Sequence, residues 1–313
     1  MLRYNEHLKF LDKYKSIKDL DFYLTEPCRL NTLFWIINSY KILQKEIPNK
    51  KNIVKFVLDC KNADGGYGGS VGFPSTILTT FNALQILSIL EEKFYDENTI
   101  NFILKKHKED GSFKNDSFDM SDNRINCSAI LSLHLLYINC ENKERDFYEP
   151  INVKFFEKIK FDYKKCINYI INCYNLDGGF GLEKNDESHC AFTFCCISSL
   201  RSLGYLDYIN KRDISKFILL RQGKNGGFSG RIDKKEDVCY SFWAYATLII
   251  LKKDYLIDKV RLTNFILTCQ SLKGGFSDRP GNEPDPYHLM FSLAALSLLN
   301  YNKLSSIDPG LAF

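Results

Sequence analysis

Apolar residues recur in this sequence as two kinds of helical segment that alternate along the chain. Segments of the first kind are amphipathic, and each contains an aromatic residue followed by two aliphatic ones. A turn containing glycine comes next, followed by a second segment that is apolar on most faces. The aromatic residues that mark these five units are Phe56, Phe102, Tyr169, Phe217 and Phe265.

This repeat predicts helical hairpins, each with an amphipathic outer helix and an apolar inner helix, because a helix that is apolar all round must be buried. An N-terminal pair at 6–14 and 30–43 lacks the glycine turn but completes the set. We therefore expect an all-α fold, an α6/α6 barrel of six hairpins. An open solenoid would show the same periodicity, but the inner segments are too apolar to line an open groove. The other inner segments are 77–90, 125–138, 189–203, 239–251 and 288–299.

One interval in the repeat, between Phe102 and Tyr169, is longer than the others. The extra residues fall around 139–160, where the chain becomes rich in Glu, Lys and Asn between two apolar patterns. We expect this stretch to be a surface insertion in a single domain that spans 1–313.

Composition and charge narrow the function classes. A net charge of +4 over 313 residues is too small and too evenly mixed to indicate nucleic-acid binding. The 11 cysteines have no disulfide-framework spacing, the printed sequence has no long apolar run, and we expect no secretory leader. We expect reduced thiols in a cytoplasmic protein without a transmembrane segment, so any lipid must bind inside a pocket.

Residues able to do chemistry fall at the same place in three units, at the start of the inner helix. His189 follows Ser188, Cys239 follows Asp237, and His288 follows an Asp-Pro pair. Each preceding residue is a typical helix cap. In a barrel of repeating hairpins every inner helix starts at the same end, so these three side chains are expected to meet at one mouth.

The residues at that mouth offer ligands for a metal ion. Asp237, Cys239 and His288 would supply one oxygen, one sulfur and one nitrogen, which leaves a fourth tetrahedral position open, as in catalytic zinc sites. Asp237 and Cys239 can reach one ion only if they straddle the helix start. The alternatives are a capping Asp beside a buried structural Cys, and a histidine that is simply hydrogen-bonded near a helix cap.

The same mouth carries the donors and positive charge that a diphosphate requires. His189, Arg231, Lys234 and Tyr240 lie near helix N-termini, which attract anions. Below them the inner helices would enclose an apolar cavity, although aromatic residues at helical spacing are also common in ordinary cores. Candidate lipid contacts are Trp243, Phe192, Phe194 and Cys195.

At this point the chain resembles the β subunits of protein prenyltransferases over nearly its whole length. The matching stretches are Glu187-Ser-His189, Gly230-Arg231 with Lys234, Asp237-Val-Cys239-Tyr240-Ser-Phe-Trp243 and Asp285-Pro-Tyr-His288. Within that family it is most similar to the type II enzymes, the Rab geranylgeranyltransferases. That likeness rests on Ser16-Ile-Lys-Asp together with Thr25-Glu-Pro-Cys-Arg29-Leu, and on Leu84-Gln-Ile-Leu, Asp177-Gly-Gly-Phe-Gly and Gly274-Gly-Phe-Ser-Asp-Arg-Pro-Gly.

The resemblance implies a mechanism. Zn²⁺ on Asp237, Cys239 and His288 would hold the acceptor cysteine as a thiolate, the form of cysteine that is nucleophilic, and this thiolate would attack C1 of the prenyl chain. The departing diphosphate would be stabilised by His189, Arg231, Lys234 and Tyr240. Asp278 matches a position where an aspartate accompanies magnesium use, so Mg²⁺ is also expected.

The resemblance also bears on the lipid and the partners. Asn31 matches the position where farnesyltransferases place a tryptophan and geranylgeranyltransferases a small residue. The longer geranylgeranyl chain would gain about 4 kcal/mol from five more buried carbons at roughly 0.8 kcal/mol each. A helical-repeat α subunit is the implied partner, and the implied substrates are geranylgeranyl diphosphate and a Rab GTPase delivered by a Rab escort protein.

Three other functions compete with this reading. A farnesyl or type I geranylgeranyl enzyme would act on a CaaX tail directly, and Asn31 and Asp278 respectively argue against these two. A terpenoid cyclase would need an acidic Asp-x-Asp-Asp cluster, which the sequence lacks. A non-catalytic repeat scaffold would have no reason to keep both the metal-ligand set and the diphosphate set.

Overall fold

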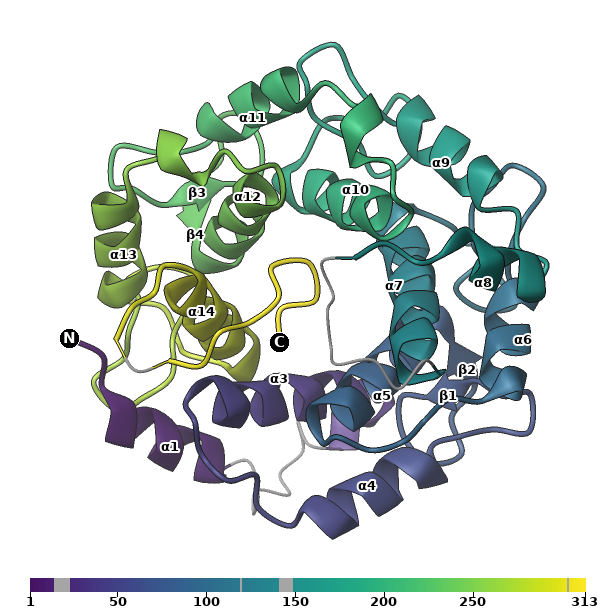
Figure 1. Cartoon of the computed structure of the whole chain (residues 1–313). Helices are drawn as coiled ribbons and strands as arrows, with labels where there is room; N and C mark the ends of the chain where they lie inside the picture. Colours follow the sequence, from purple (N-terminus) through teal and green to yellow (C-terminus); the bar gives the residue numbers. More distant parts are fainter. Residues whose placement is uncertain (14–22, 119, 141–148, 303) are drawn as a thin grey trace.

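A ring of apolar helices forms the centre of the molecule. A computed structural model describes residues 1–13, 23–118, 120–140, 149–302 and 304–313. Each inner helix contacts the next one along the chain, and the last contacts the first, so the ring is closed (Figure 1). These inner helices are α3 (Arg29–Ile42), α5 (Ile77–Ile89), α7 (Asn123–Cys140), α10 (Cys190–Ser202), α12 (Val238–Ile250) and α14 (Pro286–Leu298).

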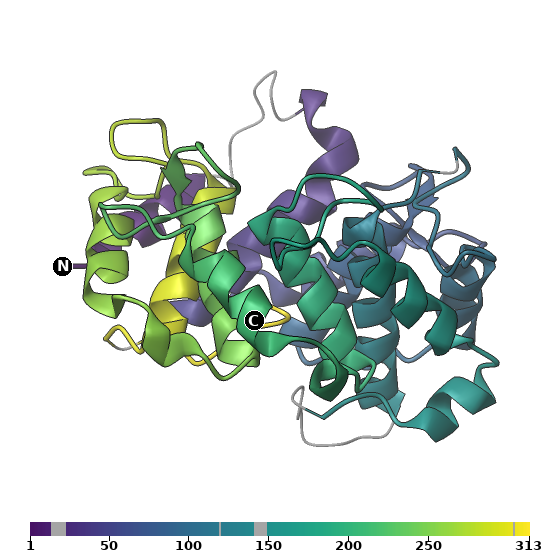
Figure 2. The ribbon, with the colours of Figure 1, turned by 90° about the horizontal axis from the view of Figure 1, so that it is seen from above.

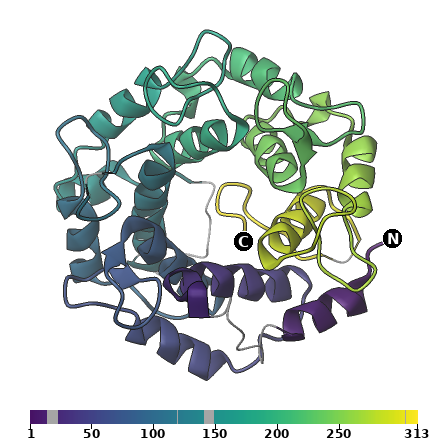
Figure 3. The same cartoon turned by 180° about the vertical axis from the view of Figure 1, so that it is seen from behind.

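An outer ring of amphipathic helices surrounds this centre (Figures 1 and 3). Each outer helix precedes an inner helix in the chain, and α4, α6, α11 and α13 contact the inner helix that follows them. The six-hairpin α/α barrel predicted from the repeat is therefore confirmed, and an open solenoid is excluded by the contact between α14 and α3. The outer helices are α1 (Tyr4–Lys13), α4 (Lys50–Asp59), α6 (Glu97–Lys105), α9 (Tyr163–Asn172), α11 (Lys211–Leu219) and α13 (Lys259–Thr268).

The repeated sequence motif has a repeated hydrogen bond. In four units the backbone N–H of the aromatic residue in the glycine turn donates to a side chain near the start of the inner helix. This bond fixes the turn against the inner helix and satisfies a buried donor. The pairs are Tyr67 with Thr80, Phe113 with Asn126, Phe180 with Thr193 and Phe228 with Ser241.

The glycine that opens each turn is required by backbone geometry. Gly178 has φ of +91°, and a Cβ there would lie 2.4 Å from the carbonyl oxygen of Asp213, at the start of the next outer helix. Gly226 repeats this arrangement beside Arg261 of α13. Only glycine tolerates both the positive φ and the close approach, which explains why the motif recurs.

Short elements complete the loops at the end where inner helices begin, which is the upper face in the edge-on view of Figure 2. Two antiparallel hairpins lie there, and the second one holds Asp237 directly before α12. The strands are β1 (Tyr67–Gly68) with β2 (Ser75–Thr76), and β3 (Phe228–Ser229) with β4 (Glu236–Asp237). A 3₁₀ turn, η1 (Glu26–Cys28), precedes α3 at this end, whereas η2 (Leu206–Tyr208) and η3 (Asp254–Leu256) follow the ends of α10 and α12 and lie at the opposite end.

His7 of α1 joins the N-terminal helix to the last repeat. Its Nδ1 accepts the backbone N–H of Gly275 at 3.0 Å, so the proton must sit on Nε2, which donates to Oε1 of Gln270 at 2.9 Å. The ring also stacks on Phe276, with centroids 4.9 Å apart. Burial lowers the pKa of His7 to about 4, so this clasp uses a neutral imidazole.

The predicted insertion around 139–160 lies partly outside the described residues, which omit 141–148. Its described part contains α8 (Val153–Lys158), capped by Asn152. Phe155 and Phe156 of this short helix are buried, and Phe155 packs 5.2 Å from the Tyr137 ring of α7. This end of the insertion therefore contributes to the core, whereas surface exposure of 141–148 stays a prediction.

Candidate functional site

The start of α12 brings Asp237 and Cys239 to the mouth of the barrel. Asp237 is the N-cap, and its Oδ1 accepts the backbone N–H of Cys239 at 2.8 Å. The predicted arrangement, with the acid at the cap and the thiol in the first turn, is confirmed. Burial and the negative charge of Asp237 hold the pKa of the Cys239 thiol well above its usual value.

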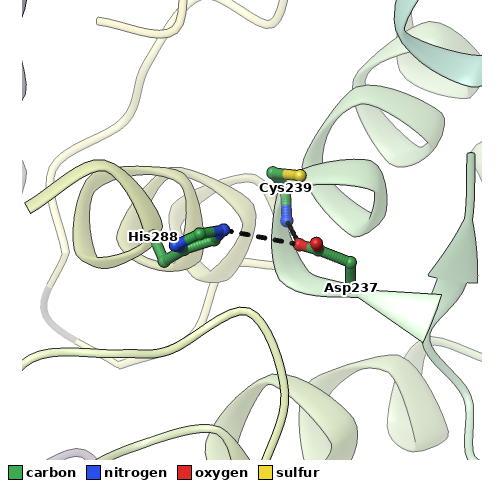
Figure 4. A group of neighbouring side chains, drawn as sticks. All are labelled: Asp237, Cys239 and His288. Atoms are coloured by element: carbon green, nitrogen blue, oxygen red, sulfur yellow. Dashed lines mark hydrogen bonds and ion pairs between the residues drawn. The ribbon is translucent and has the colours of Figure 1, made fainter. Parts of the chain in front are cut away.

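The start of α14 brings His288 to the same place. Asp285 caps the helix by accepting the backbone N–H of His288 at 2.9 Å, with Pro286 in the first turn as expected. The other carboxylate oxygen of Asp285 lies 2.5 Å from Nδ1 of the His288 ring. This contact holds the proton on Nδ1 and leaves Nε2 directed toward Asp237, whose Oδ1 is 3.8 Å away (Figure 4).

Asp237, Cys239 and His288 form a compact group of potential metal ligands (Figure 4). One oxygen, one sulfur and one nitrogen lie within 4.8 Å of one another, and Asp237 and Cys239 are buried. A carboxylate that orients a ligating imidazole, as Asp285 orients His288, is a regular feature of metal sites. Burial lowers the pKa of His288, but the hydrogen bond and charge of Asp285 outweigh it and raise the pKa overall.

His189 sits one position earlier than predicted. It is itself the N-cap of α10, and its Nδ1 accepts the backbone N–H of Ala191 at 3.2 Å. The prediction that Ser188 caps this helix is wrong, because the Ser188 hydroxyl donates instead to the Asp177 carboxylate at 2.7 Å. Burial and the nearby charge of Arg231 lower the pKa of His189 to about 4. The ring is therefore neutral at pH 7, with its proton on Nε2, where it can donate to a ligand.

The four residues predicted to hold a diphosphate line one pocket of about 360 Å³: His189, Arg231, Lys234 and Tyr240. Gly230 also lines it, and a Cβ at that position would lie 2.6 Å from Nε2 of His189 and 2.9 Å from the Tyr240 ring. Glycine thus keeps the histidine accessible. The Arg231 guanidinium reaches across to Glu187, with Nη1 to Oε2 at 2.6 Å.

Two cations of this pocket, Lys235 and Arg279, were not predicted. The repeat carries a signal for Arg279, because Gly-Gly-Phe-Ser-Asp-Arg279 aligns with Gly-Gly-Phe-Ser-Gly-Arg231. The Arg279 side chain is fixed by donating Nε–H to the backbone oxygen of Glu236 at 3.0 Å, and Nη1 lies 2.9 Å from Asp278.

Asp278, the predicted magnesium residue, has both carboxylate oxygens in hydrogen bonds. Oδ2 accepts from Arg279, and Oδ1 accepts from Asn282 at 2.7 Å. Its backbone oxygen also accepts the N–H of Val238 in the first turn of α12. Asp278 therefore joins the loop before α14 to the start of α12, and its role toward a metal stays a prediction.

An aromatic wall extends from the pocket across the barrel mouth. Phe192 lies 4.7 Å from His189, and Tyr240 lies 5.8 Å from Trp243. Beyond Trp243, three aromatic residues that sequence reasoning missed continue the wall through edge-to-face contacts. These are Phe291, Tyr287 and Trp35, with successive centroids 5.1, 4.8 and 5.2 Å apart.

The remaining lipid candidates differ in their surroundings. Cys195 lies one turn beyond Phe192 and is partly accessible, and its contact with the Cys127 thiol together with burial holds its pKa well above the usual range. Phe194 is buried and packs 5.8 Å from Phe242, which makes it a core residue. Asn31 lies in the first turn of α3 and is partly accessible.

The family of the chain follows from comparison with known proteins. Residues 2–313 match the family model described as the prenyltransferase alpha-alpha toroid domain. A geranylgeranyl transferase type-2 β subunit of Saccharomyces cerevisiae is 34% identical over 73% of this chain and 68% of its own length. The chain belongs to the protein prenyltransferase β-subunit family. A type-2 β subunit of Candida albicans is 33% identical over 74% of this prenyltransferase chain and 68% of its own length.

Solved structures confirm the fold of this prenyltransferase. A protein geranylgeranyltransferase-I of Candida albicans complexed with GGPP superposes with a TM-score of 0.81 at 23% identity, over 99% of this chain and 95% of that one. A type II terpene cyclase from Scytonema matches with a TM-score of 0.59 at 9% identity, over 95% and 96% of the two chains. Within the described residues of the prenyltransferase, no helix is both long and apolar enough to cross a bilayer.

Proposed function

We propose that this chain is the catalytic β subunit of a type II geranylgeranyltransferase, which transfers a geranylgeranyl group from its diphosphate to C-terminal cysteine thiols of Rab GTPases. The observation that carries the proposal is the adjacency of the Asp237, Cys239 and His288 group to the cationic pocket. Arg279 belongs to that pocket and also lies 4.0 Å from Asp237. The type-2 relatives from two yeasts support the choice of enzyme class.

The donor set of the ligand group fits Zn²⁺. Zinc accepts carboxylate, thiolate and imidazole ligands, and three protein ligands leave one position for a substrate. When bound, the ion would supply Lewis acidity that keeps the acceptor cysteine deprotonated at neutral pH. Asp285 holds the His288 ring in the tautomer whose Nε2 can bind a metal. Asp237 fixes the position of the Cys239 backbone through its cap hydrogen bond.

The pocket residues would bind the diphosphate and stabilise the charge that grows on it as the C1–O bond breaks. Nε2–H of His189 would donate one hydrogen bond, and Arg231, Lys234 and Arg279 would supply positive charge. Arg231 would exchange its ion pair with Glu187 for a phosphate contact. Mg²⁺ at the diphosphate, in the neighbourhood of Asp278, would add further charge neutralisation.

The partners follow from the same proposal. The prenyl chain would lie along the wall formed by Phe192, Tyr240 and Trp243, with Asn31 beside its distal part. A helical-repeat α subunit would complete the enzyme, and a Rab escort protein would deliver the Rab acceptor in the cytoplasm. A CaaX enzyme, either farnesyl or type I geranylgeranyl, would use the same chemistry on a different tail.

The test is prenyl transfer by this chain co-expressed with a candidate α subunit. Labelled geranylgeranyl and farnesyl diphosphates would be offered with a Rab ending in two cysteines, with and without escort protein, and with a CaaX acceptor. Escort-dependent transfer of the geranylgeranyl group is the expected result. Escort-independent transfer to the CaaX acceptor would replace the type II assignment by its sister class. Absence of transfer to every acceptor would favour a non-catalytic scaffold.

A matched pair of cysteine variants controls that assay. Cys239→Ala removes the proposed metal ligand and should abolish transfer, whereas Cys28→Ala changes an exposed cysteine in η1 and should leave transfer unchanged. Full activity of both variants would refute the assignment of Cys239 as a metal ligand. The class of acceptor would still follow from the transfer reactions of the unmodified chain.

A further inference from the structure

The inward faces of the inner helices are accessible near one end of the barrel and buried toward the other. On α12, Tyr240 and Trp243 are partly accessible, whereas Thr247, one turn farther along the same stripe, is completely buried. On α10, Phe192 and Cys195 are partly accessible, and the following turns are buried. Something therefore fills the barrel below its first two helical turns.

The filling element is the segment 307–313, every residue of which is buried. This segment runs into the middle of the ring of inner helices, where the C label lies in Figures 1 and 3. Its first anchor is a buried, two-pronged ion pair between Asp308 and Arg201 of α10, with N–O distances of 2.7 and 2.8 Å. Asp308 also accepts the backbone N–H groups of Gly310 and Leu311 at 2.8 and 2.9 Å.

Two further anchors bind the backbone of this segment to other inner helices. Asn38 of α3 donates to the backbone oxygen of Ala312 at 2.6 Å, and Gln85 of α5 donates to that of Leu311 at 3.3 Å. Both polar side chains are buried, so their hydrogen bonds specify where the segment sits. The segment is consequently held from three sides of the barrel.

Phe313 packs against the face of α3 that also carries Asn31, a residue predicted to contact the lipid. Its ring packs edge-on against Phe34, with centroids 6.5 Å apart. Phe34 follows Asn31 by three residues on α3, so it lies one turn deeper along the same face. A prenyl chain that passes Asn31 would next meet Phe34 and Phe313.

We propose that the segment 307–313 forms the floor of the lipid cavity and that Phe313 limits the length of prenyl chain the enzyme can bind. This inference rests on the proposed function. A floor made by a separate peptide segment differs from a floor made by the helices, because its depth can change while the barrel stays the same. The expected ligand class is a prenyl diphosphate whose chain ends against the Phe313 ring.

The size of the effect follows from the volume of that ring. Phe313→Ala removes six ring carbons, close to the five carbons of one isoprene unit. Each buried methylene contributes roughly 0.8 kcal/mol, about a fourfold gain in affinity, so a 25-carbon diphosphate that is excluded from the unmodified enzyme should gain at least about tenfold. The affinity for the 15-carbon diphosphate should change little, because its chain stops short of the floor.

The test is equilibrium binding of the 15-, 20- and 25-carbon prenyl diphosphates to the purified heterodimer, which requires no turnover. Phe313→Ala should raise the ratio of 25- to 20-carbon affinity at least about tenfold, and Phe313→Leu should give a smaller rise. Phe118→Ala, which changes an 87% exposed phenylalanine in the loop before α7, is the control and should leave the ratio unchanged.

The outcomes separate the two proposals. If the unmodified protein binds none of the three diphosphates, the proposed function fails. If it binds the shorter ones but both Phe313 variants keep its length preference, the floor inference alone is overturned. If Phe313→Ala is too unstable to purify, Phe313→Leu, which retains an apolar side chain, still tests whether Phe313 sets the length preference.

Discussion

The guanidinium of Arg279 lies 4.0 Å from the carboxylate of Asp237, measured from Nη2 to Oδ2, while the same side chain lines the cationic pocket. One residue thus contacts both the candidate metal group and the candidate diphosphate site. The distance between the two sites is fixed by hydrogen bonds from Arg279 to Glu236 and Asp278. Such placement would align the acceptor thiolate with the carbon that carries the leaving group.

Replacing Arg279 with alanine should weaken binding of geranylgeranyl diphosphate by about ten- to a hundredfold, because a charge-assisted hydrogen bond contributes about 1.5–3 kcal/mol. Metal content should stay near that of the unmodified protein, since Arg279 is not a ligand. Titration calorimetry with the diphosphate and elemental analysis would measure the two effects. Arg212→Ala, on the exposed surface of α11, is the charge-matched control, and equal affinities of the two variants would contradict the assignment.

His189 serves both as a helix cap and as a candidate donor, and two substitutions should separate these roles. Asparagine is a good cap, so His189→Asn should keep the melting temperature close to normal but lose the Nε2–H donor and with it diphosphate affinity. His189→Ala should lose both, with a stability loss of roughly 0.5–2 kcal/mol. Thermal unfolding combined with diphosphate titration would distinguish them. Normal diphosphate binding by His189→Asn would show that the ring is structural only.

Asn31 tests the wall of the lipid site. Asn31→Trp should fill space beside the distal part of the chain and shift the preference from the 20-carbon toward the 15-carbon diphosphate. Competition between the two labelled donors in one transfer reaction would report the ratio directly. An unchanged donor ratio would remove Asn31 from the lipid site, without affecting the claim about Phe313.

Stability should fall with acid because His7 is buried as a neutral ring. Its pKa is about 4 in the folded protein against roughly 6.5 when unfolded, so between these values only the unfolded state binds the proton. His7 therefore destabilises the fold by about 1.4 kcal/mol per pH unit as pH falls through this window, and has no such effect above it. The free energy of unfolding, measured with urea at several pH values, should fall less steeply with acid in His7→Gln than in the unmodified protein. Parallel plots of this free energy against pH for the two proteins would contradict this.

The helices and the ligand group could be predicted because their determinants are local. Apolar periodicity gave the hairpins, and the caps at Asp237 and Asp285 fixed where α12 and α14 begin. Equivalent positions in a closed repeat converge in space, which brought Cys239 and His288 together. The prediction failed at Ser188, where the hydroxyl could pair either with its own helix or with Asp177, and a sequence does not rank two such hydrogen bonds.

Contacts between distant parts of the chain explain what sequence reasoning missed. The Arg201 and Asp308 pair joins residues that lie 107 positions apart in the sequence, and no spacing rule connects them. In the sequence, the spacing of Tyr287 and Phe291 is that of ordinary core residues, and only the closed barrel shows that they continue the aromatic wall. Arg279 is different, because aligning its repeat with that of Arg231 would have predicted a second arginine at the pocket.

The most direct test of the account is cobalt substitution of the metal group, monitored by absorption spectroscopy. The purified heterodimer should bind one Co²⁺ per β chain and show a thiolate-to-cobalt charge-transfer band from Cys239. That band should grow when an acceptor carrying a C-terminal cysteine is added together with a non-reactive prenyl diphosphate analogue, because a second thiolate then binds the ion. Cys239→Ser should lose the original band, and Cys28→Ser should keep it. Full cobalt binding by Cys239→Ser, or a charge-transfer band that does not change when the acceptor is added, would contradict the assignment of Asp237, Cys239 and His288 as the metal site that binds the acceptor thiolate.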